Sequence, residues 1–367
     1  MPKGDRSVIF ARMSTQRLYA LPVETTEWKF DGATEIQFNW EYDDGSDALL
    51  ELYEKGKQQQ WDASKRLNWS LELNPDNPME LKDEAISIHD TDYWRRMTDK
   101  EKAWLRRNLQ ANSISQFMHG EQGALIATAK IVSTVPDINA KFYAATQVMD
   151  EARHVEAYKR LLHEKMQLAY PINKALQTLL EQTLTDQRWD MTYLGMQVLI
   201  EGLALAAFQS IRDKAGNTLA SAVNAYVMQD ESRHVSFGRL ALREYYPELS
   251  DAERDEREAF VVEALYFMRD RFNQSEVWER LGLPAKVLDE IHYNSKQMNS
   301  FRGRLFSRVV PTVKDIGLWG PRVRKAFGEM GVMEYADVDV GQQLANDGKV
   351  ADDFDKKMFV EQAIAAE

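Results

Sequence analysis

From about residue 98 onward, apolar residues recur every three or four positions, which is the period of one helix face, and no run of residues is a convincing strand. The motif TDKE at residues 98–101 has the form of a capping box, and a long helix should follow it to about Val135. Pro136-Asp137 starts a second helix, which reaches about Met166. The predicted fold class is all-α.

Helix breakers and capping signals divide the rest of the chain into further helices. The expected segments are a third helical region from Tyr170-Pro171 past Trp189 to the C-cap signal KAGN at 214–217, a fourth helix from about Thr218 to Tyr245, a fifth that starts at the capping motif SDAE at 250–253, and a sixth around 284–298. Residues 1–90 are irregular by pattern, apart from one helical segment near residues 48–61.

Composition and charge exclude several classes of protein. The net charge of −12 over 367 residues argues against a nucleic-acid partner or an anionic membrane surface. The absence of cysteine excludes disulfides, iron–sulfur clusters and thiolate zinc sites, and it fits a cytoplasmic location. Residues 1–16 lack the apolar core of a signal peptide. Residues 192–211 are apolar enough to resemble a membrane span, but Glu201 stands in their middle, so we expect a buried core helix and no span.

Basic residues are concentrated in one stretch near the end of the chain. Residues 300–325 contain seven Arg or Lys and one acid, Asp315, whereas residues 328–367 are acidic. Two interpretations are open: a solvated surface that pairs with the acidic residues after it, or a binding surface for an acidic partner or an anionic substrate.

One charge-dense motif occurs twice in this helical part of the chain. Residues 149–158 read MDEARHVEAY and residues 229–238 read QDESRHVSFG, so both contain Asp-Glu-x-Arg-His. The Glu and His of each motif stand three residues apart and therefore share one helix face, where they can bind one cation. A single Glu-x-x-His occurs by chance on surface helices, but two copies on two long helices are a much stronger indication of a metal site.

Two isolated acids complete the pattern. Glu121 and Glu201 each stand among small or apolar residues, where an unpaired carboxylate is costly. Each lies 30 residues before the glutamate of a motif, and the midpoints are Pro136 and Gly216, at the predicted helix breaks. Both members of each pair are then about 15 residues, or about 22 Å, from the turn of an antiparallel hairpin, at equal height. The alternative is a pair of structural salt-bridge clusters.

Four ionised carboxylates and two imidazoles would carry a charge of −4, which two divalent cations would balance. The oxygen and nitrogen donors suit iron or manganese. Asp150 and Asp230 directly precede the motif glutamates, so each could accept the free N–H of the opposite histidine and fix its tautomer. Arg153 and Arg233 would then screen these aspartates.

With these motifs, residues 98–245 resemble the ferritin-like di-iron carboxylate superfamily, and the doubled Asp-Glu-x-Arg-His is similar to that of bacterial di-iron monooxygenases and acyl-carrier-protein desaturases. The resemblance implies a four-helix bundle with additional helices and two iron ions, with a manganese–iron pair as the alternative. The implied metal ligands are Glu121, Glu151, His154, Glu201, Glu231 and His234.

A weaker resemblance concerns residues 52–70, which are similar to the segment before the bundle in ribonucleotide reductase small subunits and ligand-binding oxidases. Trp61 matches a tryptophan that couples to a metal-side aspartate there; plain core packing is the alternative. Tyr158 stands four residues after His154, where the reductase subunit carries its radical tyrosine; an ordinary aromatic of a helix interior is the alternative.

Departures from these patterns count against three subfamilies. The first ligand is Glu121, where the reductase subunit usually has Asp, and the last 30 residues contain no tyrosine for electron relay. Arylamine N-oxygenases carry an extra histidine seven residues before the last ligand, where this chain has Val227. Ligand-binding oxidases cross-link a valine and a tyrosine at positions that match Gly123 and Met196. The arylamine N-oxygenases and the ligand-binding oxidases are therefore disfavoured.

The resemblance implies an oxygenase or hydroxylase that uses dioxygen on an apolar or acyl-type substrate. We expect a separate reductase or ferredoxin as electron donor, because no flavin or iron–sulfur motif occurs, and we leave open whether the chain forms a homodimer. Thr128 could assist proton delivery or simply pack. The small and apolar residues expected to line a cavity are Gly123, Ala124, Thr128, Leu205, Ala206, Phe208 and Val227. The alternatives are a radical-generating subunit that uses Tyr158 and a ferroxidase or iron-handling protein.

The chain is expected to form one main unit with additions at both ends. Residues 1–90 form an extension that packs on the bundle, residues 91–248 form the di-metal bundle, residues 249–325 add helices to the same domain, and residues 326–367 form an acidic, loosely held tail.

Overall fold

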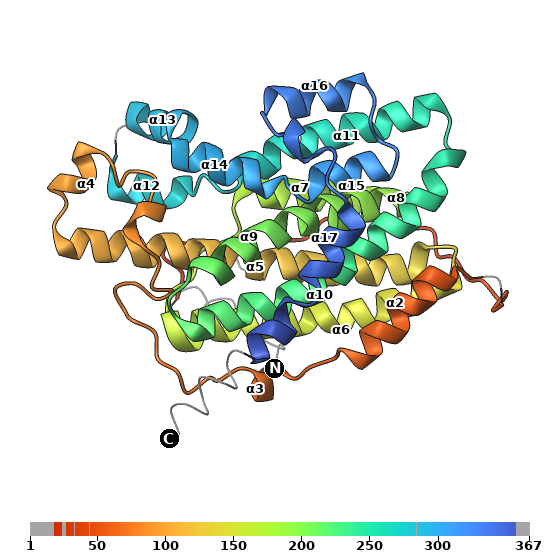
Figure 1. The fold of residues 1–367 in the computed structure, drawn as a ribbon, viewed down its shortest axis with the longest axis horizontal. Helices are drawn as coiled ribbons and strands as arrows, with labels where there is room; N and C mark the ends of the chain where they lie inside the picture. The colour runs from red at the N-terminus through yellow and green to blue at the C-terminus, as the bar shows by residue number, and fades with distance from the viewer. Residues whose placement is uncertain (1–17, 24–26, 33, 44, 284, 357–367) are drawn as a thin grey trace, which may run out of the picture.

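The computed structural model describes residues 18–23, 27–32, 34–43, 45–283 and 285–356, and helices dominate them (Figure 1). The only β-type pairing within these residues is an isolated bridge between Tyr19 and Ala169. The predicted all-α class is confirmed. The residues considered for a signal peptide and the last eleven residues of the chain lie outside the described part.

Four long helical segments form the centre of the molecule (Figure 1). They are α5 (Asp99–Thr134), α6 (Ile138–Arg160), the continuous run α8 (Trp189–Tyr193), η3 (Leu194–Ile200) and α9 (Glu201–Lys214), and α10 (Thr218–Tyr245). Short polar side chains start three of them: Thr98 in the predicted capping box, Asp137 at the start of α6, and Asn217 at the start of α10. The expected boundaries of these helices are therefore confirmed within a few residues.

The third helical region differs from the prediction. It contains two separate helices, α7 (Lys174–Thr185) and the run that begins at Trp189, because Asp186 and Arg188 adopt extended backbone between them. Arg188 donates to the Asp186 carboxylate at 2.7 and 3.0 Å, which stabilises this turn. Helix α7 packs against α5 and α11 (Asp251–Asp270) and lies outside the central bundle.

Two stretches of the central helices are π-helical, with i→i+5 hydrogen bonding. They are η2 (Leu161–Met166) at the end of α6 and η3 (Leu194–Ile200) directly before Glu201. A π-helical turn shifts the side chains after it around the helix axis, and such turns are frequent at functional sites. Glu201 is the first residue of the regular helix that follows η3.

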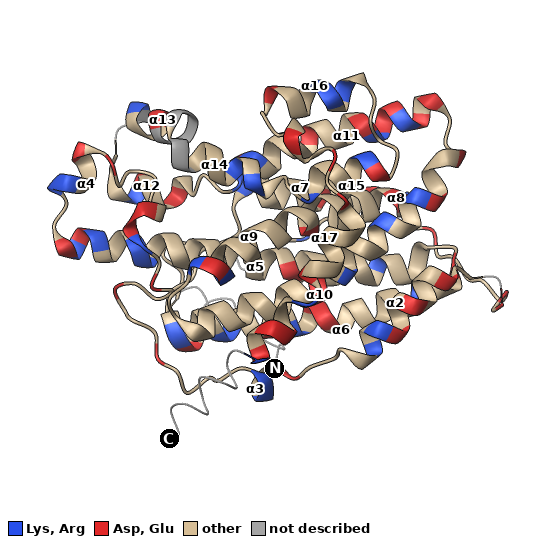
Figure 2. Ribbon diagram, in the orientation of Figure 1, with Lys and Arg blue, Asp and Glu red and all other residues tan. Residues whose placement is uncertain are grey.

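The run Trp189–Lys214 is long and apolar enough to cross a membrane, but 78% of its most apolar window is buried inside the protein. The α9 ribbon is tan along most of its length in Figure 2, and charged residues gather on outer helices such as α11 and α16 (Pro321–Glu329). This burial is the expected property of a core helix.

Shorter helices surround the bundle. Before it lie α2 (Asp47–Gln58), α3 (Ala63–Arg66), η1 (Asp83–Ala85) and α4 (Asp92–Arg96); after it lie η4 (Tyr246–Glu248), α11 (Asp251–Asp270), α12 (Ser275–Leu281), α13 (Ala285–Asn294), α14 (Lys296–Leu305), α15 (Val309–Asp315), α16 (Pro321–Glu329), η5 (Met333–Tyr335) and α17 (Val340–Asp347). The expected sixth helix is thus two helices, divided at Ser295, which caps α14.

The C-terminal segment is not loosely held as far as it is described. Val340, Leu344 and Ala351 are buried, so apolar packing anchors the segment on the bundle. The buried guanidinium of Arg308 binds the Asp347 carboxylate at 2.9 and 3.1 Å. Lys314 also pairs with an acid of this segment, at 2.7 Å. The basic stretch therefore pairs at two places with the acidic residues that follow it.

Candidate metal centre

The six acids and histidines singled out by the repeated motif and its 30-residue spacing lie together in the centre of the bundle. Glu121 comes from α5, Glu151 and His154 from α6, Glu201 from α9, and Glu231 and His234 from α10. All six side chains are buried. Acids are almost never buried without a partner, so the cluster needs a compensating charge.

Both imidazoles present Nδ1 to the carboxylates. The Nδ1 of His154 lies 3.1 Å from Glu121 Oε2, 3.4 Å from Glu151 Oε2 and 3.2 Å from Glu231 Oε1. The Nδ1 of His234 lies 3.1 Å from Glu151 Oε1 and 3.4 Å from Glu231 Oε1. Glu151 and Glu231 therefore lie between the two imidazoles.

The potential ligand atoms form two overlapping groups. Glu121, Glu151, His154 and Glu231 offer atoms that all lie within 4.8 Å of one another, and so do Glu151, Glu201 and His234. Because Glu151 belongs to both groups, the two positions where a cation could sit are adjacent. This is the arrangement of a binuclear site with a carboxylate between the metals.

The outer nitrogen of each histidine faces an aspartate from the other motif. His154 Nε2 lies 3.1 Å from Asp230 Oδ2, and His234 Nε2 lies 3.3 Å from Asp150 Oδ2. An ionised carboxylate accepts a hydrogen bond and cannot donate one, so Nε2 carries the proton and Nδ1 keeps a lone pair for a metal.

Two arginines connect the two aspartates. Arg153 Nη2 donates to Asp150 and, at 3.0 Å, to Asp230. Arg233 Nη2 donates to Asp230 at 2.6 Å and to Asp150 at 3.3 Å. Each arginine therefore contacts both aspartates, and the array is nearly symmetric. Burial would raise the pKa of Asp230, but Arg233 and His154 outweigh it and lower this pKa well below its usual range.

Trp61 contacts the same array through a hydrogen bond. Its indole Nε1 donates to Asp230 Oδ2 at 2.7 Å, and the Arg153 guanidinium lies 4.8 Å from its ring centroid. The half-buried segment between α2 and α3 therefore covers the aspartate–arginine array. Trp61 is more than a packing residue, because it supplies a polar contact to the aspartate that faces His154.

Three glutamines of the site were not recognised in the sequence. Gln60 donates to Asp150 at 2.8 Å and accepts from Arg153 at 2.8 Å, and Gln59 accepts from Arg233 at 2.7 Å. Gln147 donates to Glu151 at 2.9 Å and to Glu201 at 3.0 Å. Gln147 stands four residues before Glu151 and therefore shares its helix face. This spacing could have indicated from the sequence that the two side chains lie together.

Burial and mutual repulsion determine the protonation of the cluster. Burial raises the pKa of Glu121 and Glu201 well above the usual range, and the charge of Glu231 raises both further. Burial would also raise the pKa of Glu151, but the two imidazoles outweigh it and hold this pKa below its usual range. The surrounding carboxylates raise the pKa of both histidines against the effect of burial. In the metal-free protein, protons on the glutamates and histidines whose pKa is raised therefore reduce the negative charge of the cluster, as bound cations would.

The donor set fits two metal ions. Two buried carboxylate oxygens of the cluster, Glu201 Oε2 and Glu231 Oε2, have no hydrogen-bond partner in the described part of the chain. Such orphaned atoms are rare in protein interiors and indicate a missing partner. Carboxylate and imidazole donors without thiolates suit iron or manganese.

Comparison with known families gives the same chemistry. The model of the family described as "P-aminobenzoate N-oxygenase AurF" matches residues 43–317, which is well over half of the chain. The chain belongs to this family. It is accordingly a di-iron oxidoreductase of the ferritin-like superfamily, as the sequence predicted.

This membership corrects one inference from the sequence. The arylamine N-oxygenases were disfavoured because Val227 stands where an additional histidine was expected, and the family match overturns that exclusion. Val227 itself is fully buried in α10. The valine at this position therefore does not place the chain outside the AurF family.

Two solved structures show a distant similarity to this chain. An aldehyde deformylating oxidase from Synechococcus is 17% identical, with a TM-score of 0.45, and the match covers 61% of this chain and 96% of that one. A variant of the R2-like ligand-binding oxidase with a Mn/Fe cofactor is 16% identical, with a TM-score of 0.45, and the match covers 77% of this chain and 96% of that one. No curated protein matches the sequence.

Tyr158 and Thr128 are both buried in this AurF-family chain, and no hydrogen bond among the described residues joins either of them to a carboxylate of the cluster. The Tyr158 hydroxyl donates to Asn224 Oδ1 at 3.2 Å, and burial raises its pKa well above the usual range. Thr128 Oγ1 has no hydrogen-bond partner within the described residues. Neither residue belongs to the two groups of potential metal ligands.

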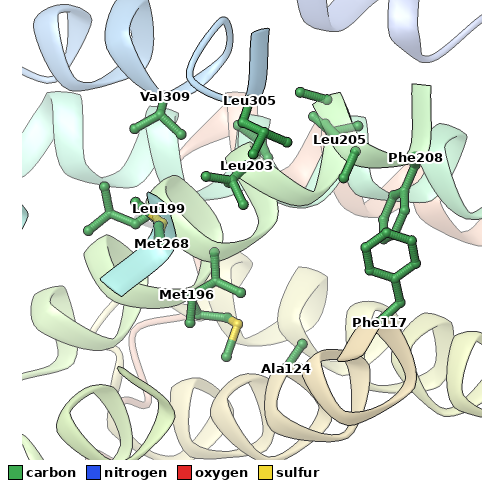
Figure 3. Packing of buried hydrophobic residues seen from close by; sticks show 14 of the residues in the cluster. Phe117, Ala124, Met196, Leu199, Leu203, Leu205, Phe208, Met268, Leu305 and Val309 are labelled. Atoms are coloured by element: carbon green, nitrogen blue, oxygen red, sulfur yellow. The ribbon is translucent and has the colours of Figure 1, made fainter. Parts of the chain in front are cut away.

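The cavity that the sequence suggested is partly filled. A Cβ on Gly123 would lie 2.4 Å from Leu180, so α7 occupies the space beside that glycine. A pocket of about 760 Å³ instead opens near Phe117, and its walls include Ala207, Ile211, Phe272 and Phe301. Figure 3 shows Phe117 of α5 facing Phe208 of α9, with ring centroids 4.8 Å apart. Phe117 lines the pocket and stands four residues, about one helical turn, before Glu121.

Proposed function

We propose that the six clustered residues hold two iron ions and that the protein uses dioxygen to oxygenate a small organic substrate. The observation that carries this proposal is the pair of overlapping, buried ligand groups that share Glu151. Its family membership supports the reaction class. When bound, the iron pair supplies the electrons that reduce dioxygen.

The contacts support a division of roles among the six residues. Glu121 and His154 would hold one ion, and Glu201 and His234 the other, with Glu151 and Glu231 between them. Asp150 and Asp230 would keep both imidazoles in the tautomer whose Nδ1 is free to bind a metal. Since the cluster is buried, surrounding apolar side chains would exclude water from the reacting atoms.

For the substrate we propose an apolar, aromatic molecule. Three phenylalanines line the pocket near the cluster, Phe117, Phe272 and Phe301, and flat rings pack well against such walls. The family description supports an aromatic amine as the oxidised group. Hydroxylation of a C–H bond is the second candidate, because Val227 replaces the histidine that was expected of an N-oxygenase. A separate reductase or ferredoxin would supply electrons, since the chain contains no cysteine for an iron–sulfur cluster.

A radical-generating function receives less support. The Tyr158 hydroxyl is bonded to Asn224 and to none of the six proposed ligands. We expect Tyr158→Phe to keep the full reaction with dioxygen, and the iron-loaded wild-type protein to show no persistent tyrosyl radical in electron paramagnetic resonance. A long-lived radical that disappears in Tyr158→Phe would favour the radical subunit instead.

The test of the proposed function begins with anaerobic loading of ferrous iron and measurement of iron per chain. The reduced protein is then exposed to dioxygen with 4-aminobenzoate, aniline or toluene, and the products are identified by mass spectrometry. N-oxygenated amines support the first candidate and benzylic hydroxylation of toluene supports the second. A protein that takes up no iron, or that grows an iron mineral from excess ferrous iron without oxidising any substrate, contradicts the proposal.

A further inference from the structure

A second sequence motif occurs twice in the bundle and ends at two of the proposed metal ligands. Residues 143–151 read YAATQVMDE and residues 193–201 read YLGMQVLIE, so both contain Tyr-x3-Gln-Val-x2-Glu. The last residues of the two copies are Glu151 and Glu201. Helical residues four apart share one face, so each copy places a tyrosine and a glutamine in a column that ends at its glutamate.

The two columns meet at the cluster. Gln147 of α6 donates to Glu151 at 2.9 Å and to Glu201 of α9 at 3.0 Å, so it joins the inner ends of both columns. Gln197 stands at the matching position of the second copy, in the π-helical stretch η3, four residues before Glu201. The two glutamines therefore follow the ligands as the next polar layer of the bundle interior.

The two tyrosines lie together at the other end of the columns. The ring centroid of Phe237 on α10 is 4.5 Å from that of Tyr143 and 4.8 Å from that of Tyr193. Tyr143 belongs to the first turns of α6, close to the half-buried Asp137 that caps this helix. Burial raises the pKa of Tyr193 well above its usual range, and the charge of Asp137 raises it further. The columns therefore lead from the cluster toward the surface at the α5–α6 turn.

Polar atoms along both columns lack partners. Four of their side chains are completely buried: Tyr143, Gln147, Tyr193 and Gln197. Both tyrosine hydroxyls, Oε1 of Gln147 and both amide atoms of Gln197 have no hydrogen-bond partner among the residues that the structure describes. The same holds for Oγ1 of the buried Thr192, next to Tyr193. Buried polar groups without a protein partner are rare, and ordered water usually supplies the missing hydrogen bonds.

The proposed reaction needs a supply of protons at a buried site. Insertion of one atom of dioxygen into a C–H or N–H bond consumes two electrons and two protons, and the other oxygen atom leaves as water. The electrons come from the separate reductase or ferredoxin. The six proposed ligands are buried, and none of them lines the pocket of about 760 Å³. Protons therefore have to cross the packed interior of the bundle.

We propose that the two Tyr-Gln columns bind a file of water molecules that carries protons from the α5–α6 turn to the metal centre. Water and tyrosine hydroxyls can each accept one hydrogen bond while they donate another, so protons can pass along them without ionisation of a side chain. The glutamine amides hold the waters in place, and the ring of Phe237 keeps the file narrow. This inference rests on the proposed function, which consumes the protons.

Removal of one hydroxyl distinguishes a hydrated column from a dry one without turnover. Tyr193→Phe takes away only the oxygen atom. If this oxygen binds water, the iron-loaded, anaerobic variant loses hydrogen bonds and should melt a few degrees below the wild type. If the oxygen is dry, the variant loses an unpaired polar group and melts at the same temperature or higher, which overturns the proposal. Tyr143→Phe repeats the test on the other column.

A high-resolution crystal structure of the full chain gives the direct observation. Water should lie within hydrogen-bond distance of the hydroxyls of Tyr143 and Tyr193 and of the Gln197 amide. Columns without ordered water at these atoms overturn the proposal, even in a protein that binds iron and consumes dioxygen.

Proton uptake tests whether the water file serves the reaction. A pH-indicator dye follows the uptake after the reduced, iron-loaded protein meets dioxygen. Tyr193→Phe and Gln197→Leu should slow it on the order of tenfold or more without loss of iron. Tyr246→Phe is the matched control, because Tyr246 is also buried with an unpaired hydroxyl but belongs to neither column. Uptake at the wild-type rate in both column variants, or equal slowing in Tyr246→Phe, contradicts the route.

Folding and iron content are measured separately for each variant, by circular dichroism and by metal analysis. If Gln197→Leu does not fold, Tyr193→Phe and the crystal structure still decide the outcome. Ordered water along the columns of a protein that oxygenates no substrate would uphold the water sites and contradict the proposed function. Dry columns in an active oxygenase would overturn this inference and leave the proposed function intact.

Discussion

The Nε2 of His154 on α6 lies 3.1 Å from Oδ2 of Asp230 on α10, so the aspartate of one motif faces the histidine of the other. The relation between His234 and Asp150 mirrors it at 3.3 Å. Neither motif can position its own histidine alone. The two copies of Asp-Glu-x-Arg-His therefore work as one unit, in which each half orients the proposed metal ligand of its partner.

Asp230→Asn is expected to weaken iron binding by roughly 10- to 100-fold, the usual effect of losing a carboxylate behind a ligating histidine. The amide keeps the size of the side chain but removes the charge that fixes the Nε2–H tautomer. Competition with a metal chelator measures the affinity. Asp150→Asn serves as the symmetric comparison, and unchanged affinity in both variants would show that the aspartates do not control the histidines.

The number of bound metal ions should depend on which glutamate is removed. Glu201 occurs in only one of the two groups of ligand atoms, whereas Glu151 occurs in both. Glu201→Ala should therefore retain one ion per chain, and Glu151→Ala should lose both. Native mass spectrometry after loading with manganese counts the ions. Glu156→Ala, an exposed glutamate on the same helix, is the control that keeps two. Equal losses in the Glu201 and Glu151 variants would contradict the shared position of Glu151.

The metal-free protein should lose stability as the pH rises. The pKa of Glu121 and of Glu201 is raised by burial in the folded protein, so the folded state binds more protons than the unfolded state above the usual glutamate pKa. This contribution is fully present below the unfolded pKa and disappears as the pH rises through the folded pKa. Melting curves of the chelator-treated protein from about pH 5 to about pH 8 measure it.

Glu121→Gln should reduce this pH dependence, because the amide resembles the protonated acid and does not ionise. We expect the metal-free variant to melt a few degrees higher than the metal-free wild type at the upper end of the range, on the order of 1 kcal/mol or more. In the iron-loaded proteins the order should reverse, since the variant loses a ligand. A variant that melts lower than the wild type in both states would argue against a protonated Glu121.

Trp61→Phe tests the hydrogen bond from the indole to Asp230. A bond to a charged acceptor is worth about 1.5–3 kcal/mol, so the melting temperature should fall by several degrees. Trp69→Phe is the matched control, because its indole donates to the neutral carbonyl of Ala63 at 2.7 Å and is expected to cost about 0.5–1.5 kcal/mol. If both variants lose equal stability, the charge of Asp230 adds nothing to the contact with Trp61.

Membership of the AurF family shows where a single residue can mislead. Val227 stands where the arylamine N-oxygenases are expected to have an additional histidine, and this difference predicts that the chain is not one of them. The match over residues 43–317 nevertheless includes the chain in that family. One absent side chain cannot outweigh a family match over residues 43–317. The valine at this position is one reason to test amine and C–H substrates side by side.

The helices and the six clustered residues could be predicted from the sequence because their signals are local or follow from helix geometry. Capping motifs such as Thr98 with Glu101 act within one turn. The equal spacing of 30 residues around Pro136 and Gly216 predicts equal heights in two antiparallel hairpins, since every helical residue advances the chain by about 1.5 Å.

Other features depend on contacts between segments far apart in the chain, and only the tertiary structure decided them. Leu180 of α7 fills the space beside Gly123, Val340 and Leu344 anchor a segment that its acidity suggested was loose, and the end of α11 brings Arg271 to Gly120. Burial and charge pairing arise from the whole packed chain, so an exposed and a buried arginine look identical in the sequence. The helical period determined which faces turn inward, and the packing of distant helices decided what those faces meet.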